Sequence, residues 1–437
     1  MRQFFSKENK ALLISGARQV GKTYAIRKVG AEIFDRVVEL NFIENPSLKA
    51  IFSNPRSSKE MLLRLSAYAG GNLQKSKTLF FFDEIQECPD VMTAIKFLVD
   101  EGSYKYVLSG SLLGVQMKDI RSVPVGYLAE KKMYPLDLEE FAEAVGMSKT
   151  VISHIGECYE KMMPVDDVVH KKMLELVNLY LVIGGMPEAV ATYVKTNNLH
   201  DVRSAQLEIM NLYKKDIAKY DPNNKLYIQE IFDLIPSELN AKNKRFILKS
   251  LNENAKFERY RNSFLWLSDA GVALPTYNVE EPRQPLRLNE QRNLFKLFLN
   301  DVGLLASCYP AELSLKMIMD EVNINYGAIY ENLAAQELTA HGYPLYYFNS
   351  KRQGEVDFVV EHNGDVLPLE IKSGKDFKRH HALSNIMSTP DYGIPAAIVF
   401  SNSNVSALGY ISYLPIYMLM FVRHEEMPDT VVRFSPI

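Results

Sequence analysis

The amino-acid sequence predicts an α/β fold, with a parallel sheet in its N-terminal part and a second α/β unit near its C-terminal end. Three observations lead to this prediction. A glycine-rich loop lies between an apolar segment and a helical segment in residues 11–29. A second apolar segment, residues 77–82, is followed directly by two acids. Two extended segments that carry acidic residues flank a tight turn at residues 362–365. Apolar strands that alternate with helices indicate a parallel sheet, whereas the tight turn indicates a hairpin.

The glycine-rich loop fits the pattern G-x-x-x-x-G-K-[ST] at every fixed position and reads Gly16-Ala17-Arg18-Gln19-Val20-Gly21-Lys22-Thr23. A strand, a glycine loop and a helix N-terminus form a cradle for phosphates, because backbone N–H groups and the positive end of the helix dipole point at the anion. We therefore expect residues 16–24, Tyr24 included, to bind ATP. In this pattern Lys22 reaches the β- and γ-phosphates, and the Thr23 hydroxyl binds Mg²⁺.

The two acids that follow the second apolar segment are Asp83 and Glu84. A buried strand over residues 77–82 would deliver Asp83 to the carboxyl edge of the sheet, where open α/β sheets bind ligands. We expect Asp83 to bind Mg²⁺, directly or through water. Glu84 is expected to orient and polarise an attacking water, which is a catalytic role. The alternative is that both acids merely end a strand.

Three more strands complete the predicted sheet. Residues 104–108 form one of them and end in Ser109-Gly110-Ser111. Ser109 is a candidate to bond the γ-phosphate or the lytic water, and the alternative is an ordinary serine–glycine turn. Residues 36–42 and 130–136 are expected to be the others.

Residues beyond the first sheet change to a helical pattern. A periodic run ends at Gly184-Gly185, and Pro187 is placed to begin the next helix, so residues 146–222 predict a helical lid. Short amphipathic helices followed by an extended segment over residues 223–285 predict a winged-helix-like module. Such modules either contact DNA or serve only in packing. The basic residues available there are few: Lys242, Lys244 and Arg245.

The hairpin in the C-terminal part, residues 286–437, carries a second set of polar residues. Asp357 and Glu370 are expected to lie across from one another, and strand alternation places Lys372 on the same face as Glu370. Two carboxylates and a lysine are the minimum for metal-dependent phosphodiester hydrolysis. The preceding helix offers Glu331 and Glu337, and we assign Glu337 to this nuclease-like site. Glu and Lys also alternate on ordinary exposed strands, which leaves cleavage an open question.

Bulk composition limits the class of protein. A chain of 437 residues exceeds one hydrophobic core, so about two to four domains are expected. The formal net charge of −3 gives no global basic field, and binding to nucleic acid would need a local patch. No apolar run reaches the ~18 residues of a membrane span, so we expect no membrane association. Scattered cysteines without ligand spacing favour reduced thiols and a cytoplasmic location; they are Cys88, Cys158 and Cys308.

Ten ordered segments together resemble one known family. They are residues 16–23, 81–86, 108–111, 134–141, 184–188, 213–217, 295–305, 331–338, 355–359 and 369–373. The family is bacterial and archaeal, and its members pair an AAA+-type ATPase core with a C-terminal domain of unknown function that resembles the PD-(D/E)xK nucleases. The chain departs from many relatives between Ser111 and Tyr134, where Val125-Gly126-Tyr127 replaces a Gly-Arg pair. An arginine that acts on a neighbouring subunit must then lie elsewhere, for example at Arg121.

The resemblance implies a P-loop AAA+-type parallel sheet in residues 1–145, followed by the lid and the winged-helix-like module. Residues 286–437 would be a restriction-endonuclease-like α/β domain. It also implies an ATPase that assembles into a homo-oligomer. From the motifs themselves we expect this ATPase to use Mg²⁺, with Lys22, Glu84 and Ser109 as catalytic residues. We expect hydrolysis to drive conformational switching of the C-terminal domains. Two alternatives stay open: an ATP-regulated, Mg²⁺-dependent DNA nuclease, and a nucleotide-dependent module that binds a protein partner.

Overall fold

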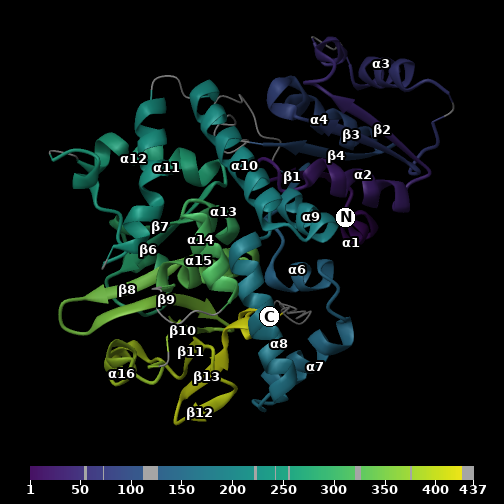
Figure 1. Cartoon of the computed structure of the whole chain (residues 1–437). Helices are drawn as coiled ribbons and strands as arrows, with labels where there is room; N and C mark the ends of the chain where they lie inside the picture. Colours follow the sequence, from purple (N-terminus) through teal and green to yellow (C-terminus); the bar gives the residue numbers. More distant parts are fainter. Residues whose placement is uncertain are drawn as a thin grey trace, which may run out of the picture.

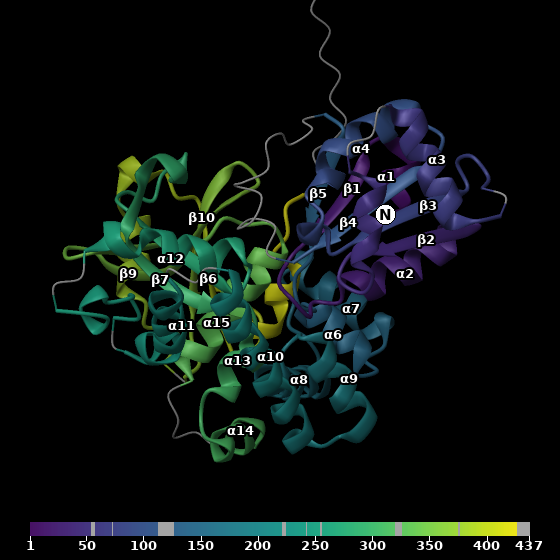
Figure 2. The ribbon, with the colours of Figure 1, turned by 90° about the horizontal axis from the view of Figure 1, so that it is seen from above.

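The computed structural model describes residues 1–53, 57–71, 73–111, 126–220, 224–241, 243–253, 256–319, 326–374 and 376–425. Within them, the chain folds around two sheets (Figure 1). Figure 2 shows the first sheet and its helices on one side of the molecule, and the second sheet with its helices on the other. Arg121 and Lys242 lie outside the described residues.

The first sheet has five strands in the order β2-β3-β4-β1-β5, and all neighbouring pairs are parallel. This confirms the parallel sheet that the sequence predicts. The strands are β1 (Ala11–Ser15), β2 (Arg36–Asn41), β3 (Thr78–Asp83), β4 (Lys105–Gly110) and β5 (Leu128–Lys132). Helices of this part are α1 (Arg2–Lys7), α2 (Lys22–Ile33), α3 (Ser58–Ala69) and α4 (Asp90–Glu101), with the short 3₁₀ turns η1 (Pro46–Ile51) and η2 (Ile85–Glu87).

Strand β3, between β2 and β4, is buried along its whole length, because helices cover both faces of the sheet. Side chains of a strand alternate between faces, and β3 follows this rule. Leu79 and Phe81 share a core with Ile26 of α2. Phe80 and Phe82 belong to a separate core that includes residues of α3 and α4. The two layers fix β3 so that its last residue, Asp83, emerges at the carboxyl edge.

A helical region follows the first sheet. Its helices are α6 (Leu138–Ala144), α7 (Lys149–Glu160), α8 (Asp167–Ile183), α9 (Pro187–Thr196) and α10 (Leu199–Tyr220). Gly184 ends α8 with φ of 73°, and Pro187 begins α9 at its first position, as the sequence predicts. In Figure 1, α10 runs from the first sheet toward the C-terminal elements.

The second sheet has eight strands in the order β12-β13-β11-β10-β9-β8-β6-β7. Its strands are β6 (Ala273–Val279), β7 (Glu290–Leu299), β8 (Tyr346–Ser350), β9 (Gly354–His362), β10 (Asp365–Ile371), β11 (Ala397–Ser401), β12 (Ser406–Leu408) and β13 (Ile411–Pro415). Its helices are α11 (Lys225–Asn240), α12 (Phe257–Asp269), α13 (Val302–Ser307), α14 (Ala311–Ile318), α15 (Gly327–Ala340) and α16 (His381–Met387), and its short turns are η4 (Leu248–Ser250), η5 (Leu286–Asn289), η6 (Pro390–Tyr392) and η7 (Ile416–Phe421).

The extended segment of the predicted winged-helix-like module is part of this second sheet. Strand β6 pairs antiparallel with β7 and parallel with β8. The predicted division at residues 285/286 therefore falls between two strands that pair with one another. An aromatic cluster joins the helical module to β7, since Phe246 and Phe264 both contact Phe295. A restriction-endonuclease-like fold for this part stays a prediction.

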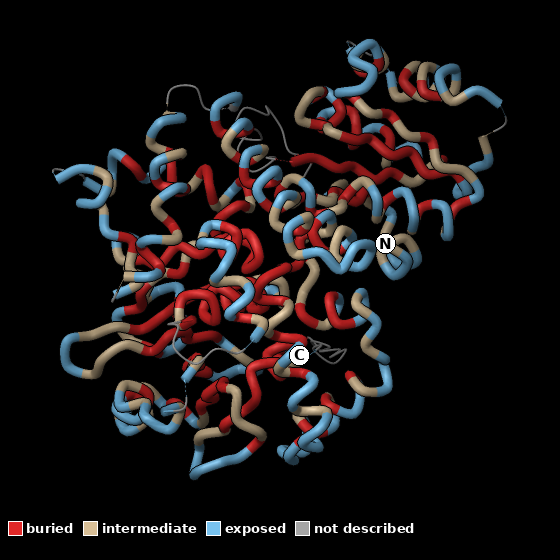
Figure 3. Tube along the Cα trace, viewed as in Figure 1, coloured by how far each residue is buried: buried red, intermediate tan, exposed pale blue. Residues whose placement is uncertain are grey.

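Helix α15 lies at the centre of the molecule and is buried on all sides from Ala328 to Leu338 (Figure 3). A buried helix with polar residues needs a partner for each polar group. Asn332 exchanges two hydrogen bonds with the Leu299 backbone, at 2.9 and 3.0 Å. The Gln336 side chain accepts a hydrogen bond from the Val302 amide at 2.8 Å. These contacts fix α15 against the end of β7 and the start of α13.

No single helix in the described ranges has both the length and the apolar character that crossing a membrane requires. Helices α8 and α9 pass that test only as a pair, and they are bent by 119° at their junction.

Candidate functional site

The glycine-rich loop lies between β1 and α2, at the carboxyl edge of the first sheet. Gly16 has φ of 142°, and a Cβ atom there would lie 2.2 Å from the Met133 carbonyl oxygen. Gly21 has φ of 90° and occupies the N-cap of α2. Only glycine adopts these conformations at low cost. The loop therefore wraps tightly around the helix N-terminus, as the sequence predicts.

Lys22 folds back over this loop. Its Nζ donates hydrogen bonds to the carbonyl oxygens of Gly16 at 3.0 Å and Ala17 at 2.7 Å. Burial lowers the pKa of the Lys22 ammonium to about 8, although Glu84 and Asp83 oppose that change. A buried cation with only two carbonyl partners is a strong binding group for an anion.

Asp83 gathers side chains from three neighbouring elements. Its Oδ2 accepts from the Thr23 hydroxyl at 3.1 Å and from the Asn41 amide at 3.2 Å, and its Oδ1 accepts from the Ser109 hydroxyl. Burial raises the pKa of Asp83. The structure thus brings together Thr23, Asp83 and Ser109, as the sequence analysis expected. Asn41 also belongs to this group. Its position at the end of strand β2 was the sequence signal that could have identified it.

Glu84 follows in a left-handed conformation, with φ of 57°. This conformation is uncommon for a residue other than glycine, and it turns the chain sharply after β3. The Glu84 carboxylate accepts a hydrogen bond from the Gln86 amide, which also lies 3.5 Å from the Ser111 hydroxyl. Gln86 therefore positions Glu84. Gln86 lies in the segment 81–86 that contributes to the family resemblance, and the sequence predicts no separate role for it.

The loop is also bonded to α10. Arg18 Nη1 donates to Asp216 Oδ1 at 2.7 Å, and the Tyr213 hydroxyl donates to the Arg18 carbonyl oxygen at 3.2 Å. The Asn300 amide donates to that same Tyr213 hydroxyl at 3.2 Å. Three hydrogen bonds thus connect the loop to α10 and then to the turn after β7.

An apolar cavity of about 510 Å³ adjoins the loop. Val20, Gly21 and Tyr24 line one side of it, and Pro187 and Val190 of α9 line the other. A flat apolar group such as a nucleotide base suits such a cavity. The start of α9 therefore lies directly across the cavity from the glycine-rich loop.

Comparisons with known proteins agree with this geometry. Residues 8–142 match the model of a family described as an AAA domain. By this similarity, residues 8–142 are referred to as the AAA domain. Residues 174–315 and 326–419 match two domains of unknown function, DUF8612 and DUF4143. A comparison with curated proteins found no match.

Three solved structures show weak similarity. ORC1 of Aeropyrum pernix in complex with DNA has a TM-score of 0.28 and 12% identity over 71% of this chain and 87% of that one. The RuvB Holliday junction branch migration motor of Thermotoga maritima has a TM-score of 0.27 and 14% identity over 63% and 83%. PCH-2 of C. elegans has a TM-score of 0.27 and 14% identity over 47% and 62%. Such low scores carry no functional argument.

The match to an AAA domain covers the residues that we expect to bind ATP. The roles assigned to Lys22, Thr23, Asp83, Glu84 and Ser109 stay predictions. Burial and mutual hydrogen bonding favour those roles, because both shift side-chain pKa values, and shifted pKa values are common at functional sites.

The second predicted site also comes together. Asp357 of β9 lies beside β10, where its Oδ2 accepts from the Ile371 amide at 2.9 Å. Lys372 Nζ donates to Glu370 Oε1 at 2.6 Å. Burial, with a further contribution from the Asp357 charge, raises the pKa of Glu370 to about 8. The acids predicted on the hairpin are therefore adjacent, although they are more deeply buried than an exposed strand face would be.

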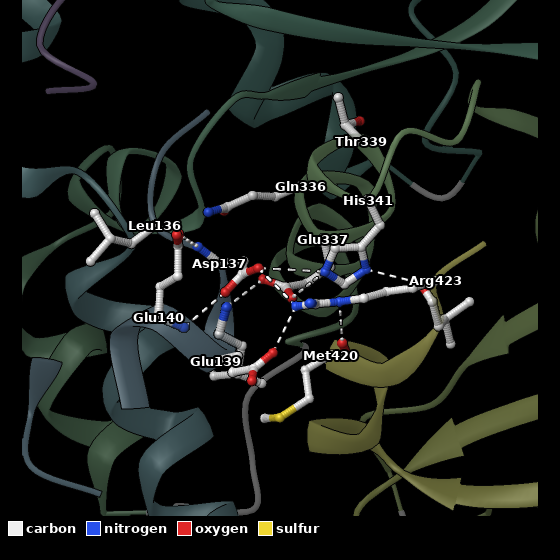
Figure 4. A network of polar contacts seen from close by, with 12 residues as sticks. Leu136, Asp137, Glu139, Glu140, Gln336, Glu337, Thr339, His341, Met420 and Arg423 are labelled. Atoms are coloured by element: carbon white, nitrogen blue, oxygen red, sulfur yellow. Dashed lines mark hydrogen bonds and ion pairs between the residues drawn. The ribbon is translucent and has the colours of Figure 1, made fainter. Parts of the chain in front are cut away.

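Glu337 does not belong to that cluster, which corrects our assignment. Its Oε1 accepts from the Leu138 amide at 2.9 Å, and its Oε2 lies 3.9 Å from His341 Nε2 (Figure 4). Glu331 takes the expected place instead, since it shares Lys296 with Asp357. Six residues of a helix span about one and two-thirds turns, so these two side chains leave α15 in different directions.

Figure 4 shows that Glu337 is part of a polar network at the junction with the AAA domain. Arg423 pairs with Asp137 at 3.2 Å and with Glu139 at 2.8 Å. His341 Nδ1 donates to the Val422 carbonyl oxygen at 2.9 Å. The network ties the end of the AAA domain to α15 and to the segment after η7.

Proposed function

We propose that this protein is a Mg²⁺-dependent ATPase whose hydrolysis cycle moves its C-terminal elements. The observation that carries the proposal is the bonded path from Arg18 through Tyr213 to Asn300. A phosphate-binding loop changes its contacts when nucleotide binds or leaves. In this chain the same loop is bonded to a helix that contacts the C-terminal elements.

The residues of the site support the binding step. Lys22 would exchange its carbonyl partners, Gly16 and Ala17, for phosphate oxygens, which are stronger acceptors. Thr23 and Asp83 supply a hydroxyl and a carboxylate 3.1 Å apart, and oxygen ligands of this kind suit Mg²⁺. Mg²⁺, when bound, neutralises charge on the β- and γ-phosphates. Asn41 and Ser109 hold the Asp83 carboxylate in a single orientation.

Glu84 would act on the attacking water. Its carboxylate lies one residue beyond Asp83, and Gln86 holds it in place. A carboxylate so positioned polarises a water molecule and accepts its proton during attack on the γ-phosphate.

The movement would begin in the loop. When Lys22 leaves the carbonyl oxygens of residues 16 and 17, the neighbouring Arg18 peptide is free to shift. Arg18 contacts α10 through both its backbone and its side chain. Homo-oligomer assembly and a cytoplasmic location stay predictions of the sequence, and both DNA and a protein remain candidate partners.

The direct test is ATP hydrolysis by the purified full-length protein, with and without double- and single-stranded DNA. We expect Mg²⁺-dependent turnover in the wild type and none in Lys22→Ala, with ATP binding lost as well. Turnover that survives in Lys22→Ala would overturn the proposal. Stimulation by DNA would identify DNA as the partner, and turnover that is indifferent to DNA would favour a protein.

A further inference from the structure

The acidic cluster of the second sheet contains a fully buried lysine. Lys296 of β7 is 0% exposed, and its Nζ lies 3.2 Å from Glu331 Oε2, 2.8 Å from Glu355 Oε1 and 4.0 Å from Asp357 Oδ1. It also lies 5.1 Å from the centre of the Tyr347 ring, which favours a cation. The Lys296 ammonium is therefore at the centre of three carboxylates.

Two further lysines face the same group of acids. Lys244, from the segment between α11 and η4, pairs with Glu331, and Lys372 pairs with Glu370. Burial alone would lower the pKa of Lys296 and of Lys244, yet their carboxylate neighbours raise both above the ordinary value. One fully buried and two partly exposed cations thus face the four carboxyl groups of the cluster.

The carboxylate oxygens that a divalent cation would need are already in use. Glu331 contacts Lys244 with one oxygen and Lys296 with the other. Asp357 Oδ2 accepts from the Ile371 amide, and Glu370 Oε1 accepts from Lys372. Glu370 Oε2 is buried without a hydrogen-bond partner.

Apart from Glu370 Oε2 and Asp357 Oδ1, each carboxylate oxygen of the cluster has a donor, so a divalent cation would have to displace these donors to gain further protein ligands. Within the described ranges, no group of three or more His, Cys, Asp or Glu side chains is arranged to hold a metal ion. The residues present therefore do not fit the metal that a nuclease of the predicted kind would require.

We infer that this cluster is an internally neutralised ion-pair centre, in which the Lys296 ammonium takes the position that a divalent cation would need. The centre holds β7, β9, β10, α15 and the segment after α11 together, and it does not cut phosphodiester bonds. Lys296 is the residue that decides this, because it contacts the acids of both α15 and β9.

The test measures binding of Mn²⁺ alone to the full-length protein without nucleotide, by the melting temperature and by the Mn²⁺ electron-spin resonance signal. Four proteins are compared: wild type, Asp357→Asn, Lys296→Met and the double variant Lys296→Met/Asp357→Asn. Lys351→Met, at an exposed lysine just before β9, is the matched control. Subtracting the Asp357→Asn signal removes any Mn²⁺ held by Thr23 and Asp83.

We expect millimolar Mn²⁺ to act equally on wild type, Lys351→Met and Asp357→Asn, and none of them to nick supercoiled DNA. Lys296→Met should melt at a lower temperature and gain an Mn²⁺-dependent rise that the double variant lacks. Mn²⁺ binding or nicking by the wild type that Asp357→Asn abolishes would overturn the inference. A folded Lys296→Met that gains no Mn²⁺ binding would overturn the role of Lys296.

Lys296→Met is the variant most at risk of misfolding, because loss of one partner leaves buried carboxylates without a counter-ion. Lys296→Met/Glu331→Gln removes a carboxylate together with the cation, and it should recover much of the lost melting temperature. The wild-type measurement decides the matter on its own if both variants fail to fold.

Discussion

Arg18 of the phosphate-binding loop and Asp216 of α10 form an ion pair at 2.7 Å, although 198 positions separate them in the chain. The Asp216 side chain is 7% exposed and that of Arg18 is 40% exposed. Solvent around Arg18 weakens the attraction, so the pair adds little to stability. It does give the loop a fixed attachment to a helix whose Tyr213 reaches the turn after β7.

The variant Asp216→Asn tests this attachment, because it removes a charge from α10 and leaves Lys22, Thr23 and Asp83 intact. We expect turnover within about fivefold of wild type, since a half-exposed pair contributes at most about 1 kcal/mol. We also expect ATP to have a smaller effect on hydrogen exchange in residues 295–305, while the Tyr213 bonds to Arg18 and Asn300 remain. Hydrogen–deuterium exchange with and without ATP measures this.

Glu39→Gln is the matched control, because Glu39 forms an exposed ion pair with Arg27 at 2.6 Å in the domain that contains Arg18. It should keep the response to ATP. An equal response in Asp216→Asn and wild type would show that the Arg18–Asp216 pair does not transmit the state of the loop.

The lowered pKa of Lys22 predicts that the affinity for ATP depends on pH. Burial lowers its pKa to about 8 in the nucleotide-free protein, so the neutral amine accumulates above that pH. Phosphates favour the ammonium form, and binding above pH 8 must then include uptake of a proton. Affinity should be nearly constant below about pH 8 and should fall by up to about tenfold per pH unit above it.

Calorimetric titration of ATP from about pH 7 to about pH 9.5 measures this dependence. Lys22→Arg is the control, because a guanidinium stays charged throughout that range. Whatever affinity that variant keeps should not follow the wild-type slope. The same slope in both proteins would assign the titration to another group.

Glu84→Gln separates binding from chemistry. The amide keeps the size of the side chain but cannot accept a proton from water, so we expect turnover to fall by about 10²- to 10⁴-fold. ATP binding should stay close to that of wild type. Single-turnover kinetics and a binding titration measure the two steps.

Gln86→Ala is the companion variant, because it removes the hydrogen-bond donor that positions Glu84 without changing the carboxylate. We expect a smaller loss of turnover than in Glu84→Gln, again with little change in binding. Equal turnover by Glu84→Gln and wild type would remove Glu84 from the mechanism.

The local parts of the nucleotide site could be predicted from the sequence. The loop, the helix that starts at Lys22 and the strand that ends at Asp83 depend on residues close together in the chain, and all appear where expected. Parallel pairing then brings Ser109 to the same edge, because consecutive strands of this pattern share their carboxyl edge.

The long-range contacts could not be predicted in this way. The sequence positions of Asp216 and Asn300 do not indicate that Asp216 contacts the glycine-rich loop or that Asn300 contacts Tyr213. Lys296 lies in an apolar strand, where a buried lysine has no local signature. Glu337 was misplaced because α15 is buried on all sides, and a helix without an exposed face does not reveal which acid points to which neighbour.

Removal of the Asp301 carboxylate is expected to lower the free energy of unfolding substantially. It is fully buried, and its two oxygens accept from the Gly185 amide at 2.6 Å and the Leu304 amide at 2.9 Å. Asp301→Ala leaves both N–H groups buried without acceptors, which should cost roughly 3 kcal/mol. Urea unfolding measures this loss. Asp166→Ala, which removes only the N-cap of α8, should cost about 1 kcal/mol.

The loss of stability in Asp301→Ala is also expected to depend on pH. Burial raises the pKa of Asp301 to about 6 in the folded protein. A raised folded-state pKa contributes stability that is present below the unfolded pKa of about 4 and is lost as the pH rises through 6. The difference between wild type and Asp301→Ala should therefore be about 1 kcal/mol larger at pH 5 than at pH 7. A difference that is the same at pH 5 and pH 7 would show that Asp301 is charged throughout this range.

Glu337 offers a test of the junction between the AAA domain and α15. Burial, together with the Asp137 charge, raises its pKa well above the ordinary value, which favours the neutral carboxyl group. Its Oε1 accepts from the Leu138 amide, and its Oε2 is buried without a hydrogen-bond partner. Glu337→Gln keeps the acceptor and the neutral state, and should change the free energy of unfolding by less than about 1 kcal/mol.

Glu337→Ala removes the acceptor and leaves the Leu138 amide unpaired, with an expected cost of roughly 2–3 kcal/mol. Urea unfolding of both variants near pH 7 separates the two effects. If Glu337 were instead an anion, Glu337→Gln would remove a buried negative charge that attracts the nearby Arg423. It would then destabilise the protein about as much as Glu337→Ala, and this result would exclude a neutral carboxyl at the junction.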